Sequence, residues 1–391
     1  MWPCARLGPG PGFRLFAGAA ALAPLLVSAC TQGTPRPGDA FPADGRALFP
    51  DLEEVVGLPD QPREGASSEF WEWWGDGQAE LSGYRLTLDR YGDPREAELA
   101  LIYVTEPHDR RTWIKDDDAR GRNRVEVLKL NFNAFFLTGI YPYGVMTSVF
   151  SPVDRYREER FQPVRIVHSA QEWCGAYSHM VWPGPDRLRS LRLSYFAGED
   201  ERVADLAAEP GTLYEDALLV QLRELDGPFA GGGEWEGWLV PALWRVRAGH
   251  GDPSPVRARI TREEAMREIS SPARPGEGFS FGSSAAVRAE TVSSPPESPA
   301  VPVTRFTLEA GDYRRVIEVE RDHPRRILGW TTSTGEEAVI LASERLPYWR
   351  LNRLGDESYR ELLGLSPRGL LPPGAGNPSP APPDAAEGPV C

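Results

Sequence analysis

The sequence predicts a mainly β (α+β) fold: an antiparallel curved sheet or a β-sandwich, with a C-terminal meander and a few helices. Apolar and polar residues alternate with a period of two over many segments between residues 79 and 343. Residues that favour turns separate these segments, and only two segments show the apolar spacing of a helix. Runs of strands with few helices are typical of antiparallel architectures.

The first predicted strand covers residues 79–90, where Tyr84, Leu86 and Leu88 share one face. A turn sequence at residues 91–94 joins it to a second predicted strand. That second strand and the later ones are predicted over residues 96–106, 125–131, 164–168, 188–196, 238–246 and 256–260.

The C-terminal part predicts a meander of short strands joined by tight turns. These strands are predicted over residues 306–308, 313–320, 327–332 and 338–343, with turns at 310–312, 323–324 and 334–335. The stronger of two predicted helices covers residues 214–225, where Leu218, Leu222 and Leu225 form one apolar stripe. A short second helix is predicted over residues 356–363.

Residues 1–29 resemble a lipoprotein signal peptide. Arg6 and Arg14 give a basic start, and the apolar run at residues 15–27 is too short to span a bilayer. The sequence Val-Ser-Ala-Cys at residues 27–30 resembles a lipobox. We expect cleavage before Cys30, lipidation of its thiol, and attachment to the outer membrane facing the periplasm. The alternatives are surface display, or an ordinary secretory signal with a chance cysteine.

The rest of the chain divides at segments rich in proline and glycine. Residues 30–48 predict a flexible tether, residues 49–365 a β-rich globular body, and residues 366–391 a disordered Pro-rich tail. A loop over residues 270–302 is a possible boundary between two β units. No sequence segment after Cys30 is long and apolar enough to predict a transmembrane helix.

The charge of the chain argues against nucleic acid as a partner. The net charge is −14, whereas nucleic acid binding requires a basic surface. An acidic body also repels anionic headgroups, so we expect the N-terminal lipid to hold the protein at the membrane while the body stays off the bilayer. Five widely spaced histidines predict no metal site, and no pattern predicts a cofactor.

Three tryptophans fall within four residues, at positions 71, 73 and 74. Exposed indole rings in water are unfavourable, so these side chains should be buried or should contact a ligand. We favour a plug at the mouth of the sheet, with stacking on a sugar as the alternative.

Two further patterns suggest chemistry. Lys129 and Asn131 lie two residues apart on a predicted strand and therefore share one face, where they could bind a carboxylate or a carbonyl, or face water. Cys174 follows Glu172 closely and suggests a nucleophilic thiol, which would need a histidine beside it. No histidine has the spacing of a known signature, so we expect Cys174 to be a small buried residue. A disulfide between Cys174 and Cys391 stays open.

Several strings together resemble a family of bacterial lipoproteins that often carries the label septum formation inhibitor Maf. The resemblance covers about residues 68–365 and rests on residues 78–86, 90–92, 104–107, 127–132, 138–141 and 171–175. It does not extend to the cytoplasmic Maf nucleotide pyrophosphatases, whose Ser-Arg-x-Asp type motif is missing near the start of this sequence. The lipoprotein family often has a histidine after the Cys-Gly pair, where this chain has Ala176.

The resemblance implies kinship and no established activity. Its strings contain the candidate site residues, which are Glu80, Tyr84, Arg90, Glu106, Lys129, Asn131, Tyr141, Glu172, Trp173 and Cys174. The favoured interpretation is a non-enzymatic envelope protein that binds a lipid, a glycan or an envelope protein in an apolar cradle of the sheet. The alternative is an envelope-polymer hydrolase that uses carboxylates, Lys129 or Cys174. It requires several of these residues to converge in one pocket.

Overall fold

The computed structural model describes residues 66–155, 161–199, 201–225, 233–268 and 300–367. All of these residues belong to one compact unit. The predictions for the signal peptide, Cys30, the tether, most of the 270–302 loop and the C-terminal tail fall outside the described residues.

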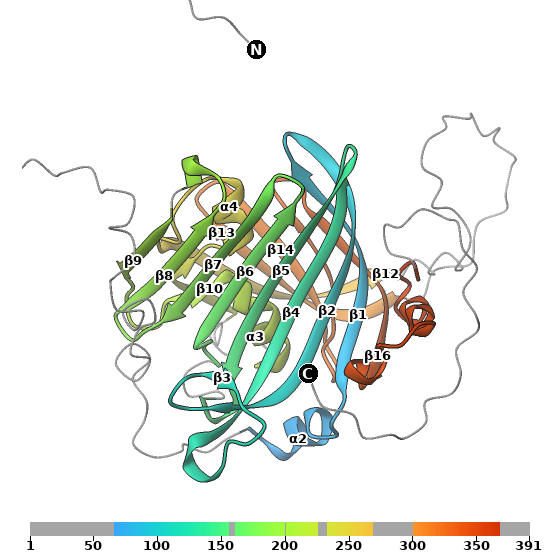
Figure 1. Cartoon of the computed structure of the whole chain (residues 1–391). Helices are drawn as coiled ribbons and strands as arrows, with labels where there is room; N and C mark the ends of the chain where they lie inside the picture. Colours follow the sequence, from blue (N-terminus) through green and yellow to red (C-terminus); the bar gives the residue numbers. More distant parts are fainter. Residues whose placement is uncertain (1–65, 156–160, 200, 226–232, 269–299, 368–391) are drawn as a thin grey trace, which may run out of the picture. The chain divides into compact units, whose positions relative to one another are not determined.

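One sheet dominates the described unit (Figure 1). It has 16 strands in the order β10-β11-β12-β13-β14-β15-β16-β1-β2-β4-β5-β6-β7-β8-β9, with β3 paired to β2. The strands are β1 (Ala79–Arg90), β2 (Asp93–Asp109), β3 (Ile114–Lys115), β4 (Arg124–Thr138), β5 (Tyr141–Pro152), β6 (Arg165–Glu172), β7 (Gly175–Pro183), β8 (Arg187–Ser194), β9 (Arg202–Ala207), β10 (Leu213–Tyr214), β11 (Glu234–Val240), β12 (Val256–Glu268), β13 (Ala300–Ala310), β14 (Tyr313–Glu320), β15 (Ile327–Thr332) and β16 (Glu337–Leu346).

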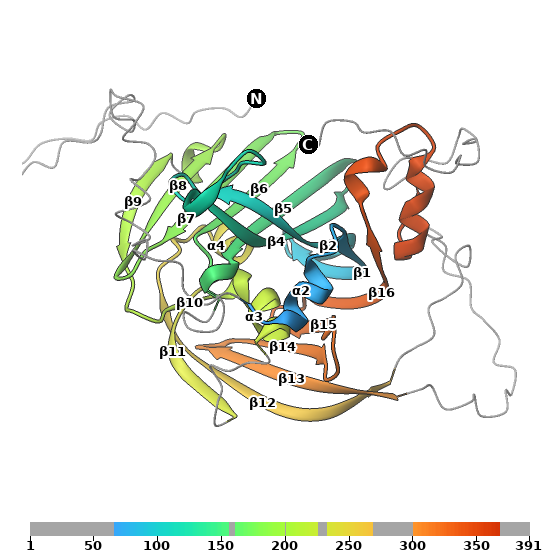
Figure 2. The same ribbon diagram turned by 90° about the horizontal axis from the view of Figure 1, so that it is seen from below.

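The sheet is strongly curved and unclosed, because β9 and β10 are its edges and no pairing joins them within the described residues. Every neighbouring pair is antiparallel except β10 and β11. The predicted fold class is therefore confirmed, in its curved-sheet form. Figure 2 shows the sheet wrapping around the helices α3 (Leu218–Glu224) and α4 (Leu243–Ala248), while Figure 1 shows α2 (Ser68–Trp74) at one end of the strands. None of the described helices is long and apolar enough to cross a membrane.

The inner, concave face of the sheet carries the main core. Leu86 and Leu88 of β1 point inward with Leu99 and Leu101 of β2, and all four are buried. A smaller apolar cluster lies on the outer face around Trp113, which the excursion between β2 and β4 brings there. The alternation that predicts these strands is therefore the alternation between the two faces.

The helix α3 lies inside the curve of the sheet (Figure 2). It extends the short 3-10 helix η4 (Glu215–Ala217), and together they confirm the helix predicted over residues 214–225. All seven residues of α3 are buried, including Gln221 and Arg223. The sequence predicts one apolar stripe, but the helix lies inside the curve of the sheet, where its polar residues are buried too.

The remaining helices correct or complete the sequence predictions. The strand predicted over residues 238–246 is wrong in its second half, because β11 ends at Val240 and α4 follows Pro241. The helix predicted over residues 356–363 is the 3-10 helix η7 (Asp356–Leu363). Four further 3-10 helices occur among the described residues: η1 (Gly121–Asn123), η2 (Val153–Arg155), η3 (Ala197–Glu199) and η6 (Tyr348–Arg350).

The tryptophan cluster forms α2, which closes one end of the curved sheet. Ser67 caps this helix by accepting a hydrogen bond from the Phe70 amide. Trp74 is buried, and its Nε1 donates to Glu224 of α3 over 3.0 Å. Trp71 remains 38% exposed. The favoured prediction of a plug therefore describes Trp74, while Trp71 lies at the surface.

The opposite end of the sheet is made of tight turns, and we call it the hairpin end. Two-residue turns join β1 to β2, β4 to β5 and β6 to β7 there, at residues 91–92, 139–140 and 173–174. The β13–β14 turn at residues 311–312 lies at the same end, because the intervening strands are all antiparallel.

Candidate functional site

An internal cavity of about 330 Å³ lies on the concave side of the sheet. It is bounded by inward side chains of β4, β5 and β14, by Asp89 near the end of β1, by η4, α3 and α4, and by the β15–β16 turn. Its lining residues are Asp89, Leu130, Phe132, Thr147, Val149, Glu215, Asp216, Leu219, Ala242, Trp244, Arg245, Ala248, Gly249, Tyr313, Arg315, Thr334 and Glu336. Concave sites with an apolar wall and a few convergent polar groups are typical of small-ligand binding.

One wall of the cavity is apolar. Leu130 and Phe132 come from β4, Val149 from β5, and Leu219 from α3. Trp244 of α4 completes this wall, and its ring lies 6.1 Å from the ring of Tyr143 in an edge contact. The strand residues alternate at period two, so the inward face of the sheet supplies hydrocarbon surface to the cavity.

The opposite wall is a network of charged groups centred on Glu215. Its carboxylate accepts hydrogen bonds from Tyr313 Oη at 2.8 Å and from Arg315 Nη1 at 3.4 Å. It also accepts from Arg245 Nη2 at 3.0 Å and from the Ala242 amide at 3.0 Å. A carboxylate buried this completely is stable only when such partners replace water.

Two neighbouring carboxyl groups therefore differ in protonation. Burial alone would raise the pKa of Glu215, but the Arg315 and Arg245 guanidinium groups hold it below its usual range. Burial raises the pKa of Asp216 to about 7. A hydrogen bond from the Leu243 amide at 2.9 Å lowers this pKa but offsets only part of the rise. The charge of Glu215 adds to that rise. Glu215 is thus ionised at neutral pH, whereas Asp216 gains or loses its proton near neutral pH.

Glu336 is a second carboxyl group in the cavity that resists ionisation. Burial raises its pKa, and the nearby Arg315 together with a hydrogen bond from Trp330 Nε1 offsets only part of the rise. Burial, followed by the charge of Glu215, also raises the pKa of Tyr313. Clusters of perturbed titratable groups in a concave site are a feature of functional sites.

A buried histidine supports the cavity wall from behind. Thr147 lines the cavity, and its Oγ1 lies 2.9 Å from Nδ1 of His168. Burial lowers the pKa of His168 to about 3, helped by His179 and Arg247, so the imidazole is neutral. Its ring lies 6.1 Å from that of Trp244. We infer that His168 positions Thr147 and Trp244 without carrying charge into the cavity.

The cavity reaches the surface at the hairpin end. Of its lining residues, Asp89, Ala248, Gly249 and Thr334 are exposed. Asp89 lies next to the β1–β2 turn and Thr334 in the β15–β16 turn, while Ala248 ends α4. A ligand would therefore enter from the hairpin end, opposite the plug formed by α2.

Three predicted site residues lie on the concave face, outside the cavity. Glu80 is buried against Arg223 of α3 at 2.6 Å, near the α2 plug. The hydroxyl of Tyr84 donates to the Ile327 carbonyl at 2.6 Å. Arg90 lies nearest the cavity, because its guanidinium stands over the cavity residue Trp244, 5.7 Å from the ring centroid.

Three others lie on the outer face. Lys129 Nζ donates to Glu106 at 2.6 Å, and Glu106 also pairs with His108 at 3.0 Å. Asn131 is buried and accepts from Ser148 at 2.7 Å. Lys129 and Asn131 do share a face, as their spacing predicts, but each is already paired with a protein group.

The last four lie at tips of the hairpin end. Tyr141 and Trp173 come from neighbouring hairpins, with ring centroids 6.2 Å apart. The Glu172 carboxylate accepts from the Cys174 amide at 2.9 Å. The prediction that Cys174 is buried is wrong, because a two-residue turn places it on the surface, where Glu172 raises the pKa of its thiol. The ten predicted residues therefore do not form one pocket.

The residues that do converge were missed by sequence reasoning. Glu215 and Asp216 begin the predicted helix, and an acidic pair at a helix start is ordinarily a capping feature. Arg245 falls in the segment wrongly predicted as strand. Tyr313 and Arg315 share one face of a correctly predicted strand, which is a signal that could have found them. Glu336 lies just beyond a turn and carries no local signal.

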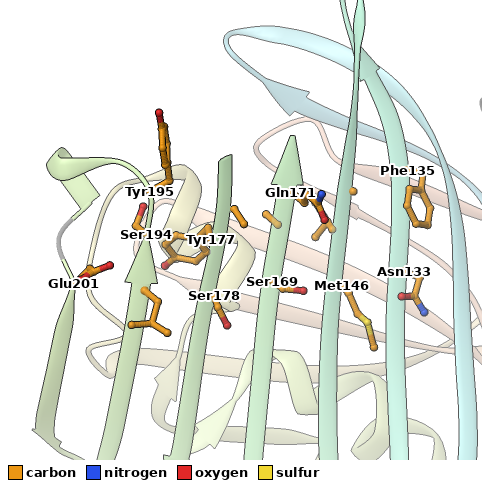
Figure 3. A pocket seen from close by; sticks show the side chains of 15 residues that line it. Asn133, Phe135, Met146, Ser169, Gln171, Tyr177, Ser178, Ser194, Tyr195 and Glu201 are labelled. Carbon is orange, nitrogen blue, oxygen red and sulfur yellow. The ribbon is translucent and has the colours of Figure 1, made fainter. Parts of the chain in front are cut away.

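A second hollow, about 580 Å³, is an open groove on the outer face of the sheet (Figure 3). Phe135 and Met146 line one side of it and Tyr195 stands at the other, with Ser169 and Ser178 between them. It contains one carboxylate, Glu201, and no network comparable to that of Glu215. The internal cavity is therefore the better candidate site. No group of three or more potential metal ligands occurs among the described residues.

No protein-family model matches the chain, and no curated protein matches it. A search of solved structures finds a beta-barrel-like protein of a domain of unknown function, DUF1849, from Brucella abortus. The TM-score is 0.38 and the sequence identity 10%, over 68% of this chain and 98% of that chain.

Proposed function

We propose that this protein is a lipid-anchored component of a bacterial cell envelope that binds an amphipathic molecule in the cavity of its curved sheet. The lipobox ending in Cys30 supports anchoring, and Thr31 directly after it favours attachment to the outer membrane facing the periplasm. One observation carries the binding proposal: a hydrocarbon wall and a network of ionisable groups face each other across one cavity.

The chemistry of the two walls favours a ligand with a hydrocarbon part and an uncharged, hydrogen-bonding head. Leu130, Phe132 and Val149 offer only apolar surface. Arg245 and Arg315 both pair with Glu215, and Asp216 beside it ionises above a pH of about 7, so two carboxylates then balance the two guanidinium charges and leave no excess positive charge for an anionic head. Arg315 Nε is buried without a hydrogen-bond acceptor among the described residues, which leaves a donor for a ligand oxygen.

A glycan is the weaker alternative. Stacking on a sugar requires an open aromatic face, and the Tyr313 ring is covered by the Arg245 guanidinium at 3.8 Å from its centroid. Trp244 is enclosed by aromatic neighbours, among them Phe136 and Tyr143. An envelope protein could not enter so small a cavity, although it could bind elsewhere.

The test is a calorimetric titration at pH 8, where Asp216 is ionised, of the mature lipidated protein with monooctanoylglycerol, octanoate and glucose. We expect monooctanoylglycerol to bind and the other two to bind more weakly or not at all. The variant Ala248→Trp places an indole at the cavity mouth and should weaken binding about tenfold or more. The matched control Met146→Trp adds the same side chain on the outer face and should bind normally. Equal affinity in both variants, or preference for glucose, would contradict the proposal.

A second function has one observation in its favour. Asp216 and Glu336 line the same cavity, and both have raised pKa values, as a general acid requires. These carboxyl groups, rather than Lys129 or Cys174, would serve a hydrolase. Its test is incubation of the protein with monooctanoylglycerol, followed by mass analysis for free octanoate. Release by wild type that is lost in Asp216→Asn would establish it, and no release would leave binding alone.

A further inference from the structure

Large apolar side chains stand exposed at successive tips of the hairpin end. Tyr91 is 58% exposed in the β1–β2 turn, Ile140 83% in the β4–β5 turn, and Trp173 68% in the β6–β7 turn. Tyr195, directly after β8, is 70% exposed. We call these four residues the apolar rim. Four such side chains at one end of a sheet are unusual for a surface that meets only water.

The backbone holds these side chains outward. Tyr91 and Gly92 both have positive φ, at 61° and 79°, as a tight two-residue hairpin turn requires. Gly139 has φ 67° beside Ile140. Tyr195 rests on Gly175, where an added Cβ would lie 2.5 Å from the Tyr195 ring. The rim is therefore built into rigid turns that end paired strands.

We propose that the hairpin end docks on a lipid bilayer through the apolar rim, which replaces the expectation from net charge that the body stays off the bilayer. The rim residues come from separate positions along this end of the sheet, a spacing that suits insertion into a fluid interface better than one continuous contact with a protein. Tryptophan and tyrosine are the side chains enriched at the membrane–water boundary. Figure 3 shows Tyr195 and Phe135 beside the outer groove, where Phe135 is 48% exposed and extends the apolar surface.

Charge specifies the kind of bilayer. The turns at residues 91–92, 139–140 and 173–174 contain no charged residue, and residues 199–201 after Tyr195 are all acidic. Basic residues that would attract anionic headgroups are therefore missing from these segments. A zwitterionic surface such as phosphatidylcholine fits the rim, and anionic lipid should weaken docking.

The rim also explains the position of the cavity mouth. Asp89 and Ala248 at the mouth lie at the same end of the sheet as the rim. Docking would therefore turn the mouth toward the bilayer, where an amphipathic molecule could enter. Docking through the apolar rim does not require the proposed ligand, so an experiment can contradict either proposal and leave the other standing. The number of residues between the predicted anchor at Cys30 and Ala66, the first described residue, is large enough to permit docking by the hairpin end.

The natural thiol of Cys174 allows a direct test. In the mature protein the predicted lipidation blocks Cys30, and Cys391→Ser leaves Cys174 as the labelling site beside Trp173. The labelled protein is reconstituted into phosphatidylcholine vesicles that contain a doxyl-labelled lipid quencher. We expect a nitrobenzoxadiazole label on Cys174 to lose about half or more of its fluorescence, as for groups buried at the headgroup boundary. A label on Ile114→Cys in a Cys174→Ser background, at the opposite end of the sheet, should keep its fluorescence.

Two matched double variants distinguish insertion of the apolar rim from nonspecific adsorption to the vesicles. Ile140→Ser with Trp173→Ser removes two rim side chains and should abolish the quenching. Leu354→Ser with Leu362→Ser removes two exposed apolar side chains away from the hairpin end and should leave it unchanged. Equal quenching at positions 174 and 114, no quenching at 174, or quenching that survives loss of the rim would each overturn the proposal. Circular dichroism of each variant confirms that it is folded.

Discussion

Glu215 and Asp216 are adjacent in the chain, yet their surroundings separate their chemistry. Glu215 is met by two guanidinium groups and a tyrosine hydroxyl, which favour its charged form. Asp216 receives one backbone amide and lies beside the charge of Glu215, which favours its neutral form. Environment, rather than residue type, therefore decides which carboxyl group in the cavity can donate a proton near neutral pH.

This difference predicts how stability depends on pH. Because burial raises the folded-state pKa of Asp216 to about 7, the folded protein keeps this proton while the unfolded chain releases it near pH 4. Its contribution to stability therefore falls as the pH rises from about 4 to about 7, and stays low above that. Asp216→Asn should raise the free energy of unfolding at pH 8 by about 1–3 kcal/mol, with little change at pH 4. Urea unfolding at both pH values checks this, and an equal effect at both would contradict it.

Apart from the Glu215 network, a second buried ion pair joins elements inside the sheet. Arg223 of α3 pairs with Glu80 of β1 at 2.6 Å and stands over the rings of Trp74 and Tyr103. It also donates to the Pro324 carbonyl in the β14–β15 connection at 2.9 Å. One side chain thus links α2, α3 and both halves of the sheet, and it is 1% exposed.

Removing this link should cost far more than removing a surface ion pair. We expect Arg223→Ala to lower the free energy of unfolding by about 3–5 kcal/mol, because Glu80 would be left buried and unpaired. The matched change Arg189→Ala breaks an exposed pair with Asp205 at 2.7 Å and should cost about 0–1 kcal/mol. Urea unfolding of the two variants decides the matter, and equal losses would show that the interior pair does not fasten the helices.

At the scale of the molecule, local patterns predict the sheet because alternation reports which face is buried. The strands β1, β2 and β12 to β16 were found this way. The strands β3, β5, β7, β9 and β10 were missed; β5 is buried continuously from Thr147 to Pro152, so it shows no alternation there. The break after Val240 was also missed, although Pro241 marks it.

The site could not be predicted in the same way. Asp216, Trp244 and Glu336 come from three elements far apart in the sequence, and only the curvature of the sheet brings them around one cavity. The turns near residues 91–92, 311–312 and 334–335 had local signals, whereas those at 139–140 and 173–174 were not predicted, and their common direction follows from strand register. The candidate residues were chosen because their sequence strings are distinctive. A distinctive string does not imply that its residues lie close together in the folded protein.

Native mass spectrometry of the mature protein, purified in mild detergent from its own membrane, tests the ligand proposal most directly. We expect wild type to carry a non-covalent amphipathic molecule, retained in Met146→Trp and lost in Ala248→Trp, whose indole blocks the mouth of the cavity. A bound species retained equally by Ala248→Trp, or wild type with no bound species that also fails to take up added monooctanoylglycerol, would contradict it.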